Sequence, residues 1–209
     1  MKYTFSIILF LIFAKDSLAQ DRFFKIDSVL NSVTNNSLEK IATYRSAYQS
    51  YNVISDGYIF WRKADSNYIQ KIQCSEYPNE QIYIYDPLKA PENDILKFFN
   101  QEKKELLNEG LIKSFEHKNS GWIDGVYNTG KPLTPHGRYS RIIILLENPV
   151  YDRHINHFDL NESTDLEKKH RNIHYNYNNE LKLVTLEKAF YQYIIKLNEK
   201  NFFKDIEKE

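Results

Sequence analysis

The chain opens with an almost wholly apolar run, residues 3–14, which follows one basic residue, Lys2. Small residues come next at Ser17 and Ala19, the positions that a signal peptidase reads. A helix over such a run is about 18 Å long, well short of the roughly 30 Å of a bilayer core. We therefore expect residues 1–19 to be a cleaved secretory signal peptide and the mature chain to begin at Gln20.

The pattern that follows predicts two helices. Apolar residues recur at spacings of three and four across residues 22–34, as on an amphipathic helix. Ser37 is a suitable N-cap for a second helix. The inner face of that helix would be formed by Leu38, Ile41, Tyr44, Tyr48 and Tyr51. Because the connection is short, we expect the two helices to form an antiparallel pair.

A change of period then indicates strands. Three segments are rich in aromatic and β-branched residues and are separated by polar turns, namely residues 58–61, 68–72 and 82–85. Together they predict a β-meander. Apolar spacing next predicts a helix from Pro91 to Gly110, since proline suits a first turn and glycine ends helices. We expect a short strand over residues 111–115.

Four of the six glycines lie within residues 119–138, which predicts either a long loop or two short strands around a wide turn. A run of Ile and Leu over residues 141–147 predicts the central strand of the sheet.

Three further elements are predicted toward the C-terminus. A capping box over residues 164–167 predicts a short helix to Arg171. Asn178-Asn179 predicts a hairpin turn between strands at residues 173–177 and 180–184. A continuous apolar stripe predicts a final helix, and its members are Leu186, Ala189, Phe190, Tyr193, Ile194 and Leu197.

These elements predict an α+β fold. We expect an antiparallel sheet, made of the meander and the central strand 141–147, with helices packed mainly on one face. No repeat or linker divides residues 20–209, so they are predicted to form a single domain.

Charge and cysteine content narrow the function classes. The chain has 28 basic and 28 acidic residues, and without residues 1–19 it has 26 and 27. A chain so close to neutral has no overall field to attract nucleic acid, so we expect no nucleic-acid partner. Cys74 is the only cysteine, which excludes an intramolecular disulfide and a lipid-modified cysteine after Ala19. The protein is expected in the periplasm or outside the cell, as a monomer without a membrane span after signal cleavage.

The glycine-rich stretch holds the strongest candidate site. His136 with the carboxylate of Asp124 has the residue types of a general base and its orienting acid. Arginines bind carboxylates and phosphates, and aromatic rings next to glycines suit a ligand that approaches the backbone. The candidate ligand-binding residues are Trp122, Tyr127, Lys131, Arg138 and Arg141. No Gly-x-Ser-x-Gly nucleophile motif accompanies them, and an ordinary surface loop is the alternative.

Four histidines have the spacing of zinc ligands, namely His154, His157, His170 and His174. Structural zinc sites favour thiolates, and this part of the chain has no cysteine. We therefore expect the spacing to be accidental, with no metal and no cofactor. Cys74, which lies outside any motif, is expected to be a buried structural residue.

Aromatic residues make up 15% of the chain and suggest a further binding surface. Tyr58, Phe60, Tyr83 and Tyr85 would form a platform for a ligand if the sheet face were bare, but helices are expected to cover them. The residues Leu-Ala-Gln at the expected cleavage site resemble those of exported Gram-negative proteins. The sequence therefore predicts an exported bacterial, non-enzymatic protein that binds a ligand or partner at the cell envelope. The alternative is a small secreted hydrolase that uses His136 with Asp124.

Overall fold

The computed structural model describes ten stretches of the chain, residues 41–48, 54–63, 66–75, 81–91, 95–116, 121–123, 126–128, 138–145, 150–163 and 171–203. All of them belong to one compact unit, which spans Lys40–Glu209. The predicted signal peptide, the helix at residues 22–34 and the capping box at residues 164–167 lie outside the described residues.

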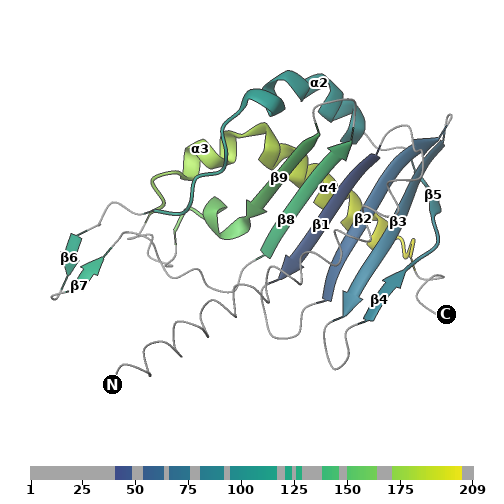
Figure 1. The fold of residues 1–209 in the computed structure, drawn as a ribbon, viewed down its shortest axis with the longest axis horizontal. Helices are drawn as coiled ribbons and strands as arrows, with labels where there is room; N and C mark the ends of the chain where they lie inside the picture. The colour runs from purple at the N-terminus through teal and green to yellow at the C-terminus, as the bar shows by residue number, and fades with distance from the viewer. Residues whose placement is uncertain are drawn as a thin grey trace, which may run out of the picture. The chain divides into compact units, whose positions relative to one another are not determined.

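The described residues are built on a seven-stranded antiparallel sheet. Its strands are β1 (Ile41–Tyr48), β2 (Ile54–Lys63), β3 (Ser66–Ser75), β4 (Gln81–Ile84), β5 (Leu88–Ala90), β8 (Arg138–Leu145) and β9 (Tyr151–Asn156). The order is β4-β3-β2-β1-β8-β9, and β5 also pairs with β3 (Figure 1). The sheet confirms the α+β class, and β2, β3 and β4 confirm the meander.

Strand β1 corrects the helix predicted after Ser37. Ile41–Tyr48 pairs with β2 on one side and β8 on the other, so it is a fully hydrogen-bonded internal strand. Thr43 and Arg45 are as buried as Ala42 and Tyr44, because this strand is covered on both of its faces. The apolar residues Ile41, Tyr44 and Tyr48 are spaced by three and four, which also suits a helix, and this spacing led to the wrong prediction.

Strands β8 and β9 differ from the expectation in position. The predicted strand at residues 141–147 is β8, which begins earlier, at Arg138, and lies next to the edge strand rather than at the centre of the sheet. Strand β9 was not predicted, because its charged residues Asp152, Arg153 and His154 interrupt the apolar pattern.

Two long helices agree with the prediction. Helix α2 (Ile95–Asn108) buries Ile95, Phe99 and Leu106, and helix α4 (Lys182–Glu199) buries most of the predicted stripe. The carboxylate of Glu109, just after the end of α2, caps the start of α4. It accepts hydrogen bonds from the backbone N–H groups of Lys182 (2.7 Å) and Leu183 (2.9 Å). These are two of the N–H groups that a helix start leaves without partners.

The hairpin predicted around Asn178-Asn179 is wrong. Residues Tyr175–Glu180 form a short helix, α3, and Lys182 already belongs to α4. Asn178 is fully buried, and its side-chain amide donates to the carbonyls of Lys113 (2.8 Å) and Asp159 (2.9 Å). The asparagine therefore serves the packing of distant segments and not a turn.

The same contacts explain why residues 111–115 do not form the predicted strand. The N–H of Lys113 donates to Oδ1 of Asn178 (2.9 Å), and the N–H of Phe115 donates to Asp159 (2.7 Å). Side chains thus take the bonding positions that a neighbouring strand would occupy. Because every buried backbone group needs a partner of some kind, these bonds substitute for strand pairing.

In the glycine-rich stretch, two short strands are observed, but only two residues connect them, so the wide turn expected between them is not. Gly121–Ile123 (β6) and Val126–Asn128 (β7) form a separate two-stranded antiparallel sheet, in which Trp122 lies opposite Tyr127.

The core lies where α2 and α4 meet the large sheet. Phe190 of α4 has no exposed surface, stacks on Tyr44 of β1 and contacts Phe60 of β2, with ring centroids 5.3 Å apart in both pairs. Phe99 of α2 contacts Tyr151 of β9 edge to face, with ring centroids also 5.3 Å apart. Ile59 and Ile72, whose side chains point to the opposite face of the sheet, are equally buried. The packing of all helices mainly on one face stays a prediction.

Candidate functional site

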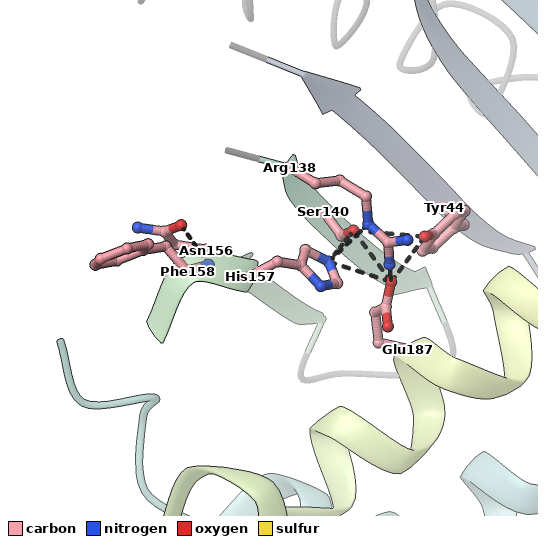
Figure 2. A network of polar contacts seen from close by, with 7 residues as sticks. All are labelled: Tyr44, Arg138, Ser140, Asn156, His157, Phe158 and Glu187. Carbon is pink, nitrogen blue, oxygen red and sulfur yellow. Dashed lines mark hydrogen bonds and ion pairs between the residues drawn. The ribbon is translucent and has the colours of Figure 1, made fainter. Parts of the chain in front are cut away.

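Chemically active side chains gather around Glu187, in the second turn of α4. Four residues reach it from other elements: Tyr44 from β1, Arg138 and Ser140 from β8, and His157 from the start of the short helix η1 (His157–Leu160) (Figure 2). We call these five residues the Glu187 cluster. Strand pairing places Ser140 of β8 opposite Ser46 of β1, close to Tyr44, and η1 continues directly from β9.

One oxygen of Glu187 is the centre of the cluster. Oε1 accepts hydrogen bonds from Tyr44 Oη (2.8 Å), Ser140 Oγ (3.2 Å) and Arg138 Nη2. The guanidinium of Arg138 also lies over the ring of Tyr191, 4.0 Å from its centroid. The carboxylate side chain is 3% exposed and that of Arg138 is 14% exposed, so a buried charge has a partly buried cationic partner.

His157 takes part in the cluster through one ring nitrogen. Its Nε2 accepts from Arg138 Nε (3.1 Å) and lies 2.8 Å from Ser140 Oγ and 3.3 Å from Glu187 Oε1. Three side chains of the cluster thus meet at this one nitrogen of the imidazole.

The surroundings of Glu187 favour its charged form. Burial raises the pKa of Glu187, but the contact with His157 and the charge of Arg138 outweigh burial, so its pKa is lowered from the usual range. Burial also raises the pKa of Tyr44, and the nearby Glu187 charge acts in the same direction. The cluster therefore holds a carboxylate, a guanidinium and a neutral phenol at neutral pH.

The cluster contains the residue types of a Ser-His-acid hydrolase but not the arrangement. In a catalytic triad, serine and acid bind opposite nitrogens of the imidazole, so that the acid orients the ring that deprotonates the serine. Here Ser140 and Glu187 both approach Nε2. Ser140 is also only 3% exposed, which leaves a substrate no path to its hydroxyl. The arrangement holds charge inside the fold and does not prepare a nucleophile.

The glycine-rich candidates are only partly covered by the described residues. Arg138 belongs to the Glu187 cluster. Arg141 forms a two-pronged ion pair with Asp152 on the neighbouring strand, at 3.0 and 2.7 Å. Trp122 and Tyr127 are placed only by their backbones, and Asp124, Lys131 and His136 lie outside the described residues. Both described arginines therefore have carboxylate partners within the chain.

The candidate zinc histidines are not gathered by the described residues. His154 is exposed beside Asp152, His157 lies in the Glu187 cluster, and His174 is 3.6 Å from Glu116. His170 lies outside the described part of the chain. Among the described residues, no three metal-ligating side chains come together.

Sequence reasoning missed most of the Glu187 cluster, although one signal was available. Glu187 lies four residues after Leu183 and three before Phe190, so it stands within the apolar stripe of α4. A carboxylate at such a position must be buried, and a buried carboxylate needs donors. Nothing in the sequence indicates which donors meet it, because they come from three distant elements.

Whereas the Glu187 cluster buries a charged side chain, strand β4 exposes apolar side chains. Ile82, Tyr83 and Ile84 are 38%, 45% and 52% exposed. Of the predicted aromatic platform, Tyr58 and Phe60 are buried as core residues, Tyr85 is half-buried, and Tyr83 is exposed. Strand β4 lies at one edge of the sheet, and among the described strands it pairs with β3 alone (Figure 1).

No protein-family model, curated protein or solved structure matches this chain, so only its sequence and geometry bear on its function. None of the described helices is long and apolar enough to cross a membrane.

Proposed function

We propose that this chain is an exported bacterial, non-enzymatic protein of the cell envelope that binds a protein partner along the free edge of β4. The observation that carries the proposal is the exposure of three consecutive apolar side chains on this edge strand. An edge strand presents unpaired N–H and C=O groups, to which a further strand can be added. Exposed apolar side chains beside such groups favour the addition.

The other edge segments of the sheet, strands β9 and β5, have features that disfavour the addition of a further strand. Strand β9 carries Asp152, Arg153 and His154 in sequence, and charged side chains disfavour pairing at an edge. Strands β4 and β5 form the other edge of the sheet, since both pair with β3. The β5 part of this edge has an exposed Lys89 and follows Pro87, which has no N–H to donate.

A bulge adds to this protection. Three residues of the edge, 85–87, lie opposite two residues of β3, Gln70 and Lys71. The side chain of Gln70 donates to the carbonyl of Tyr85 (2.9 Å), so the irregular backbone is held in place. Such bulges increase local twist and interrupt pairing. Strand β4, with the sequence Gln-Ile-Tyr-Ile, has no charge, no proline and no bulge of its own.

The Glu187 cluster supports the non-enzymatic half of the proposal. Its potential nucleophile, Ser140, is buried, and its only imidazole is bonded to other members of the cluster. The hydrolase alternative that uses His136 with Asp124 depends on residues outside the described ones and gains no support from this cluster.

Photo-crosslinking in the source cell tests the proposal. A benzophenone amino acid replaces Ile84 in one variant and Lys97, an exposed residue of α2, in the matched control. We expect a discrete protein adduct from position 84 and none from position 97. The partner, once identified and purified, should bind the wild-type chain and lose at least about tenfold in affinity for Ile82→Lys, since a charge replaces an apolar contact. Equal adducts at both positions, or unchanged affinity, would overturn the proposal.

A further inference from the structure

The backbone of β4 shows which of its groups are free to bind. The N–H of Tyr85 donates to the carbonyl of Lys71 (3.1 Å), so this residue points its backbone groups toward β3. Backbone direction alternates along a strand, and Tyr83 therefore also points toward β3. The N–H and C=O groups of Ile82 and Ile84 consequently point away from the sheet, at the free edge.

Taking the proposed function as its basis, we infer that the partner on this edge is a second copy of the same chain, paired antiparallel through β4. A twofold axis perpendicular to the sheet keeps each side chain on its own face, so residues of equal parity must lie opposite each other. With the axis at Tyr83, Ile82 lies opposite Ile84 of the partner subunit, and Ile84 opposite Ile82 of the partner subunit. These residues carry the outward backbone groups, which gives four hydrogen bonds between the copies.

The side chains suit this register as well as the backbone does. Ile82 and Ile84 lie on the same face of β4, since they pair with Cys74 and Ile72 of β3. Two copies thus bring four isoleucine side chains together on that face, while Tyr83 faces Tyr83 of the partner subunit on the other. Apolar and aromatic cross-strand pairs stabilise a sheet, whereas like charges placed opposite each other destabilise it. Strand β4 has no charged residue, so self-pairing meets no repulsion within the strand.

The size of the contact sets the expected strength. Pairing two four-residue strands covers much less than the roughly 800 Å² per partner of a typical stable interface. We therefore expect a weak dimer that forms as concentration rises, in place of the monomer expected from the sequence. A covalent trap is a more sensitive measurement of such a dimer than its size in dilute solution.

Disulfide trapping tests the register directly. In the proposed dimer the two copies of residue 83 form a non-hydrogen-bonded pair, whose Cα atoms are about 4.5 Å apart, within the range that a disulfide spans. The full chain would carry Tyr83→Cys with Cys74→Ala, which removes the only native cysteine. The matched control is Lys89→Cys with Cys74→Ala, an exposed position on the protected β5 half of the same edge.

We expect the Tyr83→Cys variant to form a disulfide-linked dimer at least about tenfold faster than the Lys89→Cys control, because only the former pair lies within disulfide reach. Adding Ile84→Lys should abolish the trapping, and sedimentation of the otherwise wild-type Ile84→Lys chain should remain monomeric at concentrations where the wild type associates. Circular dichroism checks that each variant folds. Equal trapping rates for positions 83 and 89 in folded variants overturn the self-pairing.

The two proposals fail in different ways. If the photo-adduct at position 84 contains two copies of this chain, self-pairing is supported together with the edge as a binding surface. If the adduct contains a different protein and Tyr83→Cys is not trapped, self-pairing is overturned while the edge remains a partner-binding surface. If neither adduct nor disulfide forms, the function proposed for this edge is overturned with it.

Discussion

The Glu187 cluster and the β4 edge depart in opposite directions from the usual placement of residues. The first buries a carboxylate and partly buries a guanidinium, and the second exposes two isoleucines and a tyrosine. In the cluster every group that Glu187 requires is supplied by the same chain. At β4 the outward N–H and C=O groups of Ile82 and Ile84 have no strand beside them among the described residues. The difference separates a polar cluster whose groups are paired within the chain from the edge at which we propose that a partner binds.

The strongest way to break the cluster is to remove its carboxylate. Glu187→Ala should lower the free energy of unfolding by about 3–5 kcal/mol, because it leaves the largely buried guanidinium of Arg138 without a counter-charge. Denaturant unfolding measures the loss. The double variant Glu187→Leu with Arg138→Met is the control, since removing both charges should restore most of the stability. A double variant as unstable as Glu187→Ala would contradict the ion-pair explanation.

Phe190, one turn after Glu187 on α4, gives the corresponding loss for an apolar core residue. Phe190→Ala should cost about 3–5 kcal/mol, because the ring is fully buried against Tyr44 and Phe60. The measurement is again denaturant unfolding, and Lys188→Ala, an exposed change on the same helix, is the control. A loss below about 1 kcal/mol would mean that the helix does not form the core described above.

The pH dependence of the unfolding free energy should differ between the Glu187 cluster and the apolar core. The pKa of Glu187 is lowered in the folded chain, so its stabilising effect is present above the unfolded value of about 4.3 and is lost as the pH falls through the folded pKa. The difference in unfolding free energy between the wild type and Glu187→Gln should therefore shrink as the pH falls from 7 toward 3. Phe190→Ala should keep a constant difference. Parallel curves for the wild type and Glu187→Gln would contradict the lowered pKa.

The smallest expected effect on stability lies at the edge strand. Ile84→Lys in the monomer should change the free energy of unfolding by less than about 0.5 kcal/mol, because the side chain is half exposed and its backbone groups point outward. Thermal unfolding at low concentration, where association is absent, measures it. Leu106→Lys, at a fully buried position of α2, should unfold the protein and serves as the contrast. A large loss for Ile84→Lys would assign β4 to the core.

Elements with a clear local pattern were predicted correctly, and those that depend on remote partners were not. Helices α2 and α4 each have an apolar stripe on one side, which sequence spacing reveals. Strand β1 is buried on both faces and lies between β2 and β8, so its spacing did not distinguish a strand from a helix. Asn178 was interpreted as a turn residue because of its local preference, whereas its buried contact with Lys113 is a long-range one.

The sequence did not indicate which side chains would contact the candidate site residues that the structure describes. Arg138 and Arg141 were selected as free ligand-binding groups, but the structure gives them Glu187 and Asp152 as partners. His157 was considered as a zinc ligand and the spacing was judged accidental, and the residue lies beside Ser140 and Arg138. Residue type indicated that these side chains can form ion pairs and hydrogen bonds. Their partners lie between 11 and 49 positions away along the chain, and no spacing rule reaches so far.

The sequence by itself determined the α+β class, the meander and the two long helices. Those features follow from side-chain periodicity, which each segment carries within itself. Only the tertiary structure decided that residues 41–48 are a strand and that four remote side chains meet Glu187. It also decided that β4 and β9 are the outer strands of the sheet among the described residues. These outcomes depend on which segments become neighbours, and that is settled by the pairing of the whole chain.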